Sequence, residues 1–172
     1  MVHNNQFSLE NKMEINLLLR TVSNSDLPIF YTQQKDPDAN QMAAFTSRDP
    51  SDQEAFKAHW QKIMVDNSVI IRTIVFDDLV AGYILSYLDE GKPEVGYWIG
   101  KEFWGKGIAT FALGEFLALA NPTRPMYART AKDNLASKRV LEKCGFQVIE
   151  EMKGFANARG EEIEELLMEL SN

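Results

Sequence analysis

One segment limits the fold more than any other: between residues 94 and 120, an apolar strand leads through a turn into an apolar helix. The turn holds Gly105 and Gly107, and residues 108–120 are apolar nearly all round, with Glu115 as their single charged side chain. A helix with so little polar surface is expected to be buried against a sheet. The segment therefore predicts a fold that combines helices with strands.

The same turn predicts an anion-binding site. The first N–H groups of a helix lack internal acceptors and carry the positive end of the helix dipole, and glycines let a ligand approach the backbone closely. A phosphate or pyrophosphate suits such a site, and Lys106 could add charge at its rim. Residues 105–110 match neither a P-loop nor a dinucleotide fingerprint. A turn with a purely structural role is the alternative.

The spacing of apolar residues predicts the remaining elements. Asp36-Pro37-Asp38 is expected to end the first helix, which begins near residue 27. Residues 162–170 are ambiguous, because their leucines have helical spacing whereas a turn at 157–160 favours a hairpin strand. Residues 1–13 are expected to be a loose tail and residues 14–172 a single domain. Strands are predicted over residues 15–22, 69–76, 79–88, 94–99, 126–130 and 146–155, and further helices over residues 55–64, 108–120 and 134–144.

Composition narrows the classes of function. The net charge of −7 argues against a general nucleic-acid binder and suits a cationic substrate such as an amine, although it also serves solubility alone. One cysteine excludes an intrachain disulfide and fits a reducing compartment, and two histidines with one cysteine make no conventional zinc site. There is no secretory signal or membrane-spanning run. A cytoplasmic protein without a metal, nucleic-acid or membrane partner is expected, and a homodimer stays open.

Two motifs together resemble the GNAT N-acetyltransferase superfamily. The sequence Trp104-Gly-Lys-Gly-Ile-Ala109 is similar to its Gln/Arg-x-x-Gly-x-Gly/Ala signature, with Trp104 at the Gln/Arg position. About 25 residues later, the sequence from Asn134 through Ser137 to Gly-Phe146 resembles the Asn-x-x-Ser/Ala helix of the same family. The pattern Tyr-Trp-Ile-Gly followed by Phe-Trp-Gly-Lys-Gly-Ile-Ala-Thr resembles its ribosomal-protein N-acetyltransferase branch. The resemblance follows the element order over about residues 14–170, and its motifs lie within residues 94–146.

The resemblance implies an α+β fold with a mixed sheet. About seven mostly antiparallel strands would splay between the fourth and fifth, residues 94–99 and 126–130, with about four helices. It also favours a strand at residues 162–170. Acetyl-CoA would be the co-substrate. Its pantetheine arm would enter the splay near Trp98 and Ile99 and contact Asn134, with Ser137 near the sulfur. Its pyrophosphate would rest on the signature turn, formed by Trp104, Gly105, Lys106, Gly107, Ile108, Ala109 and Thr110.

The implied reaction is direct attack of an amine on the thioester in a ternary complex. The amine must lose a proton before it attacks, and Glu94 is the candidate base, acting through water. The alternative for Glu94 is a solvated carboxylate at a strand end. A backbone N–H near Ile99 would stabilise the oxyanion. Leu141 stands where many relatives have a tyrosine as acid, so Ser137 or water would assist the thiolate, or it would leave without an acid.

The acceptor stays open between a protein N-terminal α-amine and a small-molecule amine. A non-catalytic acyl-CoA-binding or regulatory domain is the alternative function, and a nucleotide-binding domain is a third. Cys144 is interpreted as a packed thiol, because the C-terminus of a helix disfavours a thiolate. Four aromatic residues are assigned to the core, with one of them as an alternative wall of the acceptor site: Phe56, Trp60, Tyr83 and Tyr87.

Overall fold

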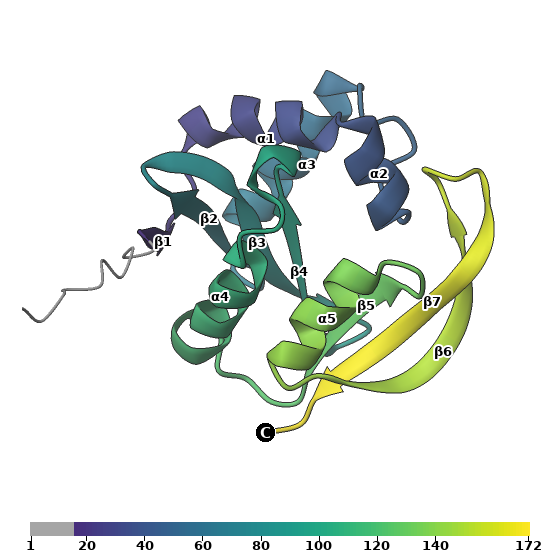
Figure 1. The fold of residues 1–172 in the computed structure, drawn as a ribbon. Helices are drawn as coiled ribbons and strands as arrows, with labels where there is room; N and C mark the ends of the chain where they lie inside the picture. The colour runs from purple at the N-terminus through teal and green to yellow at the C-terminus, as the bar shows by residue number, and fades with distance from the viewer. Residues whose placement is uncertain (1–15) are drawn as a thin grey trace, which may run out of the picture.

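The computed structural model describes residues 16–172, in which seven strands form one sheet with α-helices packed against it (Figure 1). The order in the sheet is β1-β2-β3-β4-β5-β7-β6, and every neighbouring pair except β4 and β5 is antiparallel. The predicted mixed sheet is therefore confirmed, whereas the predicted tail at residues 1–13 lies outside the described residues. The strands are β1 (Leu17–Arg20), β2 (Ile70–Phe76), β3 (Leu79–Asp89), β4 (Lys92–Ile99), β5 (Met126–Ala131), β6 (Gln147–Ala156) and β7 (Glu161–Leu170).

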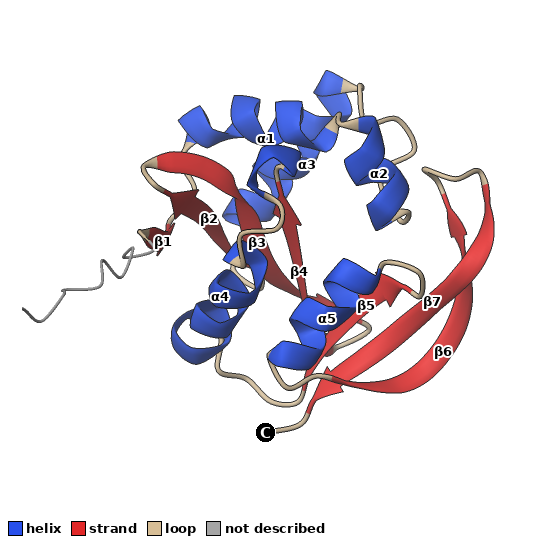
Figure 2. Ribbon diagram, in the orientation of Figure 1, coloured by secondary structure: helices blue, strands red, loops and turns tan. Residues whose placement is uncertain are grey.

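Residues 16–172 contain five α-helices rather than about four, because the sequence analysis did not predict α2 (Figure 2). The first helix ends just before Asp36-Pro37-Asp38, as predicted, and a further helix begins there. The carboxylate of Asp36 accepts the backbone N–H of Ala39 at 2.8 Å, and Pro37 occupies the first turn, where a missing N–H costs nothing. Residues 116–120 form a π-helical turn in place of the last part of the predicted long helix. The helices are α1 (Leu27–Gln34), α2 (Pro37–Ala43), α3 (Gln53–Val65), α4 (Ile108–Glu115) and α5 (Leu135–Lys143).

The two faces of the sheet pack against different helices. Side chains alternate between faces along a strand, and in β3 this divides Ile84 from its neighbours Tyr83 and Leu85. Ile84 belongs to the larger core cluster, which includes buried residues of α4 and α5. Tyr83 and Leu85 pack against the cluster that α1 and α3 form around Phe30 and Trp60. No helix among residues 16–172 has both the length and the apolar character that a membrane span requires.

β4 and β5 are joined at one point and separate beyond it. Glu94 and Tyr127 form the single paired position between these parallel strands in the described sheet. β4 continues to Ile99 and β5 to Ala131 without further pairing between them. The predicted splay between the fourth and fifth strands is therefore present, and it leaves backbone N–H and C=O groups on both strands without a partner strand.

The C-terminal segment forms a strand, although its leucines have helical spacing. β7 pairs with β6 from Glu161 to Glu169 and, on its other edge, with β5 from Glu165 to Leu170. Leu166, Met168 and Leu170 alternate into the larger core cluster, as a strand requires. Pairing on both edges therefore outweighs the local helical pattern.

Candidate active site between β4 and β5

A cavity of about 750 Å³ occupies the gap between β4 and β5. Its walls come from the turn before α4, the diverging strands, α5 and α2. The cavity brings together every site residue that the sequence predicts, from elements far apart in the chain. These residues are Glu94, Trp98, Ile99, Trp104, Gly105, Lys106, Gly107, Ile108, Ala109, Thr110, Asn134 and Ser137.

The glycine turn has the backbone shape of an anion cradle. Gly105 and Gly107 have φ values of 73° and 74°, which are strained for any residue with a side chain. No protein atom lies within 4 Å of a Cβ built at either position, so the space above the turn is open. Gly107 is the N-cap of α4, whose first turn contains no acidic side chain. The positive end of the helix therefore faces the cavity without a competing carboxylate.

Lys106 extends toward two aromatic rings of the core. Its Nζ lies 5.6 Å from the ring centroid of Phe103 and 5.7 Å from that of Phe76. Both distances are in the range of favourable cation–π contacts. The residue lines the cavity, but its charge is directed partly at these rings.

Trp104 connects the turn to the end of β4. Its indole N–H donates a hydrogen bond to the carbonyl oxygen of Ile99 at 2.9 Å. Trp98 differs, because its indole nitrogen is buried and has no hydrogen-bond partner among the described residues. A buried N–H without an acceptor is costly. Trp98 lines the cavity, although its indole nitrogen itself is buried.

The start of α5 presents polar groups to the same cavity. Asn134 is its N-cap, and its Oδ1 accepts the backbone N–H of Ser137 at 3.1 Å. This bond gives Asn134 a structural role in addition to the predicted one. The hydroxyl of Ser137 lies 2.9 Å from that of Tyr97 on β4. Leu141, one helical turn further, is 1% exposed and supplies no proton donor.

Burial raises the pKa of Tyr97 to about 12, with the Cys144 side chain adding to the shift and the hydrogen bond with Ser137 opposing it. The phenol therefore stays protonated near neutral pH and can donate to Ser137 or to a ligand. Burial also raises the pKa of Cys144. Cys144 packs against the larger core cluster, which agrees with its interpretation as a packed thiol.

Glu94 is buried and hydrogen-bonded through both oxygens, so the alternative of a solvated strand-end carboxylate is wrong. The residue is 5% exposed. Its Oε1 accepts the hydroxyl of Tyr87 at 3.0 Å, and its Oε2 accepts Nε of Arg129 at 3.2 Å. Arg129 also donates to Asp89 at 2.9 Å. A buried carboxylate needs such partners to offset its lost hydration.

The network around Glu94 contains residues that the sequence did not predict. Burial and the negative charge of Glu94 raise the pKa of Tyr87, so this phenol remains a donor to the carboxylate. Tyr87 lines the cavity. Phe56 and Trp60 instead belong to the smaller core cluster, the one around Phe30, and Tyr83 packs against it. Arg129 follows the paired position of β5 by two residues. A charged residue within an otherwise apolar strand was the signal that could have identified it.

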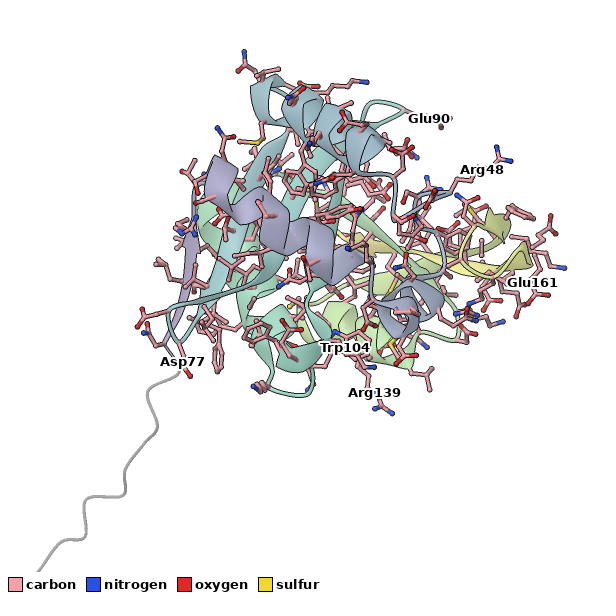
Figure 3. All side chains as sticks on the ribbon, turned by 90° about the horizontal axis from the view of Figure 1, so that it is seen from above. Arg48, Asp77, Glu90, Trp104, Arg139 and Glu161 are labelled. Atoms are coloured by element: carbon pink, nitrogen blue, oxygen red, sulfur yellow. The ribbon has the colours of Figure 1, made fainter. Side chains whose placement is uncertain are left out.

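Other charged lining residues divide the cavity into two ends. Arg139 and Lys143 lie one turn apart on α5, and with Lys106 they give the end near the glycine turn a positive character. Figure 3 shows Arg139 and Trp104 at the same edge of the molecule. Glu94 and Glu165 give the other end carboxyl groups. The basic pair on α5 was visible as an i, i+4 spacing that the sequence analysis did not use.

Comparison with known proteins identifies the family. Residues 16–147, most of the chain, match the family described as acetyltransferase (GNAT) domain. The chain belongs to the GNAT acetyltransferase family. The predicted resemblance is thereby confirmed, and the cavity lies where the two motifs of this GNAT chain meet.

One sequence relative is YdaF of Bacillus subtilis (strain 168), provisionally named a ribosomal N-acetyltransferase. It is 32% identical over 112 residues, which are 59% of this chain. The match spans 61% of that relative, less than two thirds of its length.

Solved structures share the fold at low sequence identity. The ribosomal-protein-alanine N-acetyltransferase from Brucella melitensis has a TM-score of 0.75 and 20% identity, over 90% of this chain and 99% of that one. The spermidine N-acetyltransferase from Vibrio cholerae, in complex with CoA and spermine, has a TM-score of 0.76 and 16% identity, over 90% and 95%. These likenesses establish the GNAT fold of this chain.

Proposed function

We propose that this GNAT chain transfers an acetyl group from acetyl-CoA to a primary amine by direct attack in a ternary complex. The continuity of the cavity is the observation that most supports the proposal. One hollow is lined by the glycine turn, the separated strands β4 and β5, and Glu94. A pyrophosphate on the turn would direct the pantetheine arm between the strands, with its acetyl group toward Glu94.

The residues present fit acetyl-CoA. The backbone amides from Gly105 to Thr110 would hold the pyrophosphate. The amide groups of the arm would pair with the free edges of β4 and β5, near Trp98 and Ile99. The orphaned indole N–H of Trp98 needs an acceptor there, and the side-chain NH₂ of Asn134 would donate to the arm because only Oδ1 is used in the N-cap.

The chemistry requires a neutral amine. In the proposed step, the amine nitrogen bonds to the thioester carbon, a proton passes through water to Glu94, and the carbon–sulfur bond then breaks. Each oxygen of Glu94 accepts one protein hydrogen bond. A carboxylate oxygen can accept two, so a water molecule can still bind. A backbone N–H near Ile99 would stabilise the oxyanion.

The leaving thiolate would be assisted by Ser137. Its hydroxyl lies 2.9 Å from the hydroxyl of Tyr97, so the pair would stabilise the departing thiolate by a hydrogen bond while both hydroxyls keep their protons. A free thiol has a pKa near ~8.5, so the thiolate is already a fair leaving group. The proposed contribution of the hydroxyl pair is therefore modest.

The proposed acceptor is a protein N-terminal α-amine or a small-molecule amine. The names of the Bacillus and Brucella relatives support the first class, and that of the Vibrio neighbour supports the second. An α-amine titrates near ~7.7–8.0 and a lysine amine near ~10.4, so an α-amine needs less help to lose its proton. We place the reaction in the cytoplasm, which the free thiol of Cys144 supports.

Release of CoA thiol across a panel of peptides and small amines tests the proposal. Glu94→Gln is expected to lower kcat by about 10²-fold, because a positioned base contributes about that much. Asn134→Ala is expected to raise KM for acetyl-CoA more than it lowers kcat. Tight CoA binding without thiol release from any amine would instead support the non-catalytic acyl-CoA-binding alternative.

A further inference from the structure

The cavity contains a carboxyl group that the reaction above does not use. Glu165 of β7 is half-buried and lines the cavity. Among residues 16–172, its carboxylate has no hydrogen bond to a side chain and no ion pair, whereas Glu94 nearby has both. Burial raises the pKa of Glu165, the charge of Glu94 adds to the shift, and Arg129 opposes it. An anion in such a place gains from any cation that enters the cavity.

The surroundings of Glu165 are apolar on one side. A Cβ built on Gly154 would lie 3.7 Å from Oε2 of Glu165 and 3.1 Å from the ring of Phe45. The carboxylate therefore lies over Gly154, close to this ring. Met42 and Ala39 of α2 line the cavity as well. An aliphatic chain would find an apolar wall here, next to a negative charge.

The charges at this end of the cavity do not balance. The cationic residue that lines this end of the cavity is Arg129. Its guanidinium donates hydrogen bonds to Glu94 and Asp89. The remaining cationic lining residues belong to the glycine turn and α5. Two carboxylates, Glu94 and Glu165, thus line this end of the cavity with one guanidinium, and that guanidinium also pairs with Asp89 outside the lining. A positive group supplied by the acceptor would reduce the excess negative charge.

We propose that Glu165 binds a second ammonium group of the acceptor, so that the preferred acceptors are aliphatic amines with two charged nitrogens. The inference rests on the proposed function and specifies its substrate class. The reacting nitrogen is neutral when it attacks. An ammonium held by Glu165 is therefore a different nitrogen, and the apolar wall near Phe45 suits the carbon chain between the two. Such a group could come from a small diamine or from a lysine close to the N-terminus of a peptide.

Paired acceptors test the inference. 1,4-Diaminobutane is compared with 1-aminobutane, and a peptide with lysine at its second position with the same peptide carrying glutamine there. Glu165→Gln is expected to raise KM about 10-fold or more for a doubly charged acceptor, and less than twofold for its singly charged partner and for acetyl-CoA. The pair that responds identifies the source of the second ammonium. Equal effects within both pairs, or no effect in either, would overturn the inference.

Two further variants separate binding from general charge effects. Glu161→Gln removes the same charge from the same strand, at the exposed tip of the β6–β7 hairpin (Figure 3), and is expected to change every KM less than twofold. Glu165→Asp keeps the charge and is expected to retain most of the preference for two ammonium groups. An effect of Glu161→Gln as large as that of Glu165→Gln would assign the preference to long-range electrostatics and overturn the inference.

Binding without turnover distinguishes this inference from the proposed function. Calorimetry measures Kd for 1,4-diaminobutane and for the lysine peptide on the protein saturated with CoA. Glu165→Gln is expected to raise the Kd of the responding ligand about 10-fold. Glu165-dependent binding with no acetylation of any amine would contradict the proposed function alone. Acetylation whose KM and Kd do not depend on Glu165 would contradict this inference alone.

Discussion

In the proposed mechanism, two hydroxyl groups take the place of the expected acid in the candidate active site. Leu141 is buried where a tyrosine would be expected, and Tyr97 reaches the same region from β4. The proposed hydrogen-bond donor therefore moves from a helix to a strand, and the Tyr97 hydroxyl lies 2.9 Å from that of Ser137. Sequence comparison position by position does not detect such a change, because the two residues occupy different elements.

Tyr97→Phe is expected to lower kcat about 10-fold and to leave KM for acetyl-CoA within twofold. The change removes one hydrogen bond to Ser137, worth about 1–1.5 kcal/mol, while the ring and its packing remain. Steady-state kinetics with a saturating amine measure the effect. Tyr83→Phe is the control, because Tyr83 packs in the smaller core cluster away from the cavity. Equal losses in both variants would contradict a role for the Tyr97 hydroxyl.

The buried carboxylate of Asp26 affects the stability of the fold rather than the candidate active site. Burial alone would raise its pKa, but hydrogen bonds from Arg20, from the backbone N–H of Ser23 and from Thr73 lower it to about 2. The folded pKa lies below the unfolded value of about 3.9. The charged carboxylate therefore stabilises the fold above about pH 4, and this contribution is lost as the pH falls toward 2.

Asp26→Asn is expected to reduce the free energy of unfolding by about 2 kcal/mol at pH 7. About half of the difference between variant and wild type should disappear at pH 3. Urea unfolding at the two pH values measures it. A difference that is the same at both would show that lost packing, rather than lost charge, causes the destabilisation.

The turn before α4 meets two structural requirements that usually conflict. It must expose backbone N–H groups, and it must hold them in a fixed arrangement. Positive φ at Gly105 and Gly107 aims the backbone at the cavity, and the bond from Trp104 to Ile99 ties the turn to β4. The tryptophan at the Gln/Arg position of the family signature thus has a structural explanation.

Gly107→Ala is expected to raise KM for acetyl-CoA about 10-fold. A left-handed alanine costs about 1–2 kcal/mol, and the new methyl group would project into open space where the pyrophosphate is proposed to bind. Gly91→Ala is a matched control at the β3–β4 turn, with φ of 79° and equally open surroundings. It should lose similar stability without a change in KM. A rise in KM in both variants would contradict the proposed cradle.

The local spacing of apolar and capping residues predicted most helices and strands. It was insufficient where contacts between distant segments determine the structure. The glycine turn and α5 follow from spacing and capping residues within about ten positions. The strand β7 was ambiguous in the local pattern, because its leucines have helical spacing whereas the turn at residues 157–160 favours a hairpin, and its pairing with β5 and β6 decides between them. Asp36-Pro37-Asp38 ends the first helix as predicted, but the sequence analysis did not recognise that the Asp36 cap also starts a second helix at Pro37. Proline fits both roles, and the residue before it decides.

The candidate site was predictable to the extent that it lies in one stretch of chain. The proposed cofactor half falls within residues 94–146 and was predicted from motifs. The proposed acceptor half combines Tyr87, Arg129, Glu165 and the apolar residues of α2, which come from four separate elements. The positions of these residues in the sequence do not indicate that they are neighbours. The order of strands in the sheet shows that they line the same cavity.

The arrangement of the sheet predicts how the whole molecule responds to its cofactor. CoA at 100 times its Kd is expected to stabilise the protein by about 2.7 kcal/mol. For a chain of this size that corresponds to a rise in Tm of about 5–10 °C. Thermal unfolding monitored by circular dichroism measures the shift. ATP at the same concentration should leave Tm unchanged, and a comparable shift with ATP would support a nucleotide-binding domain instead.

The single paired position between β4 and β5 has a consequence for how this protein behaves inside a cell. Two parts of one sheet meet at Glu94 and Tyr127, and the proposed cofactor would supply the contacts that a longer strand normally makes. Its rigidity would then depend on a metabolite. With acetyl-CoA bound, the two parts of the sheet would separate less often, and proteases would cut the chain more slowly than in its absence.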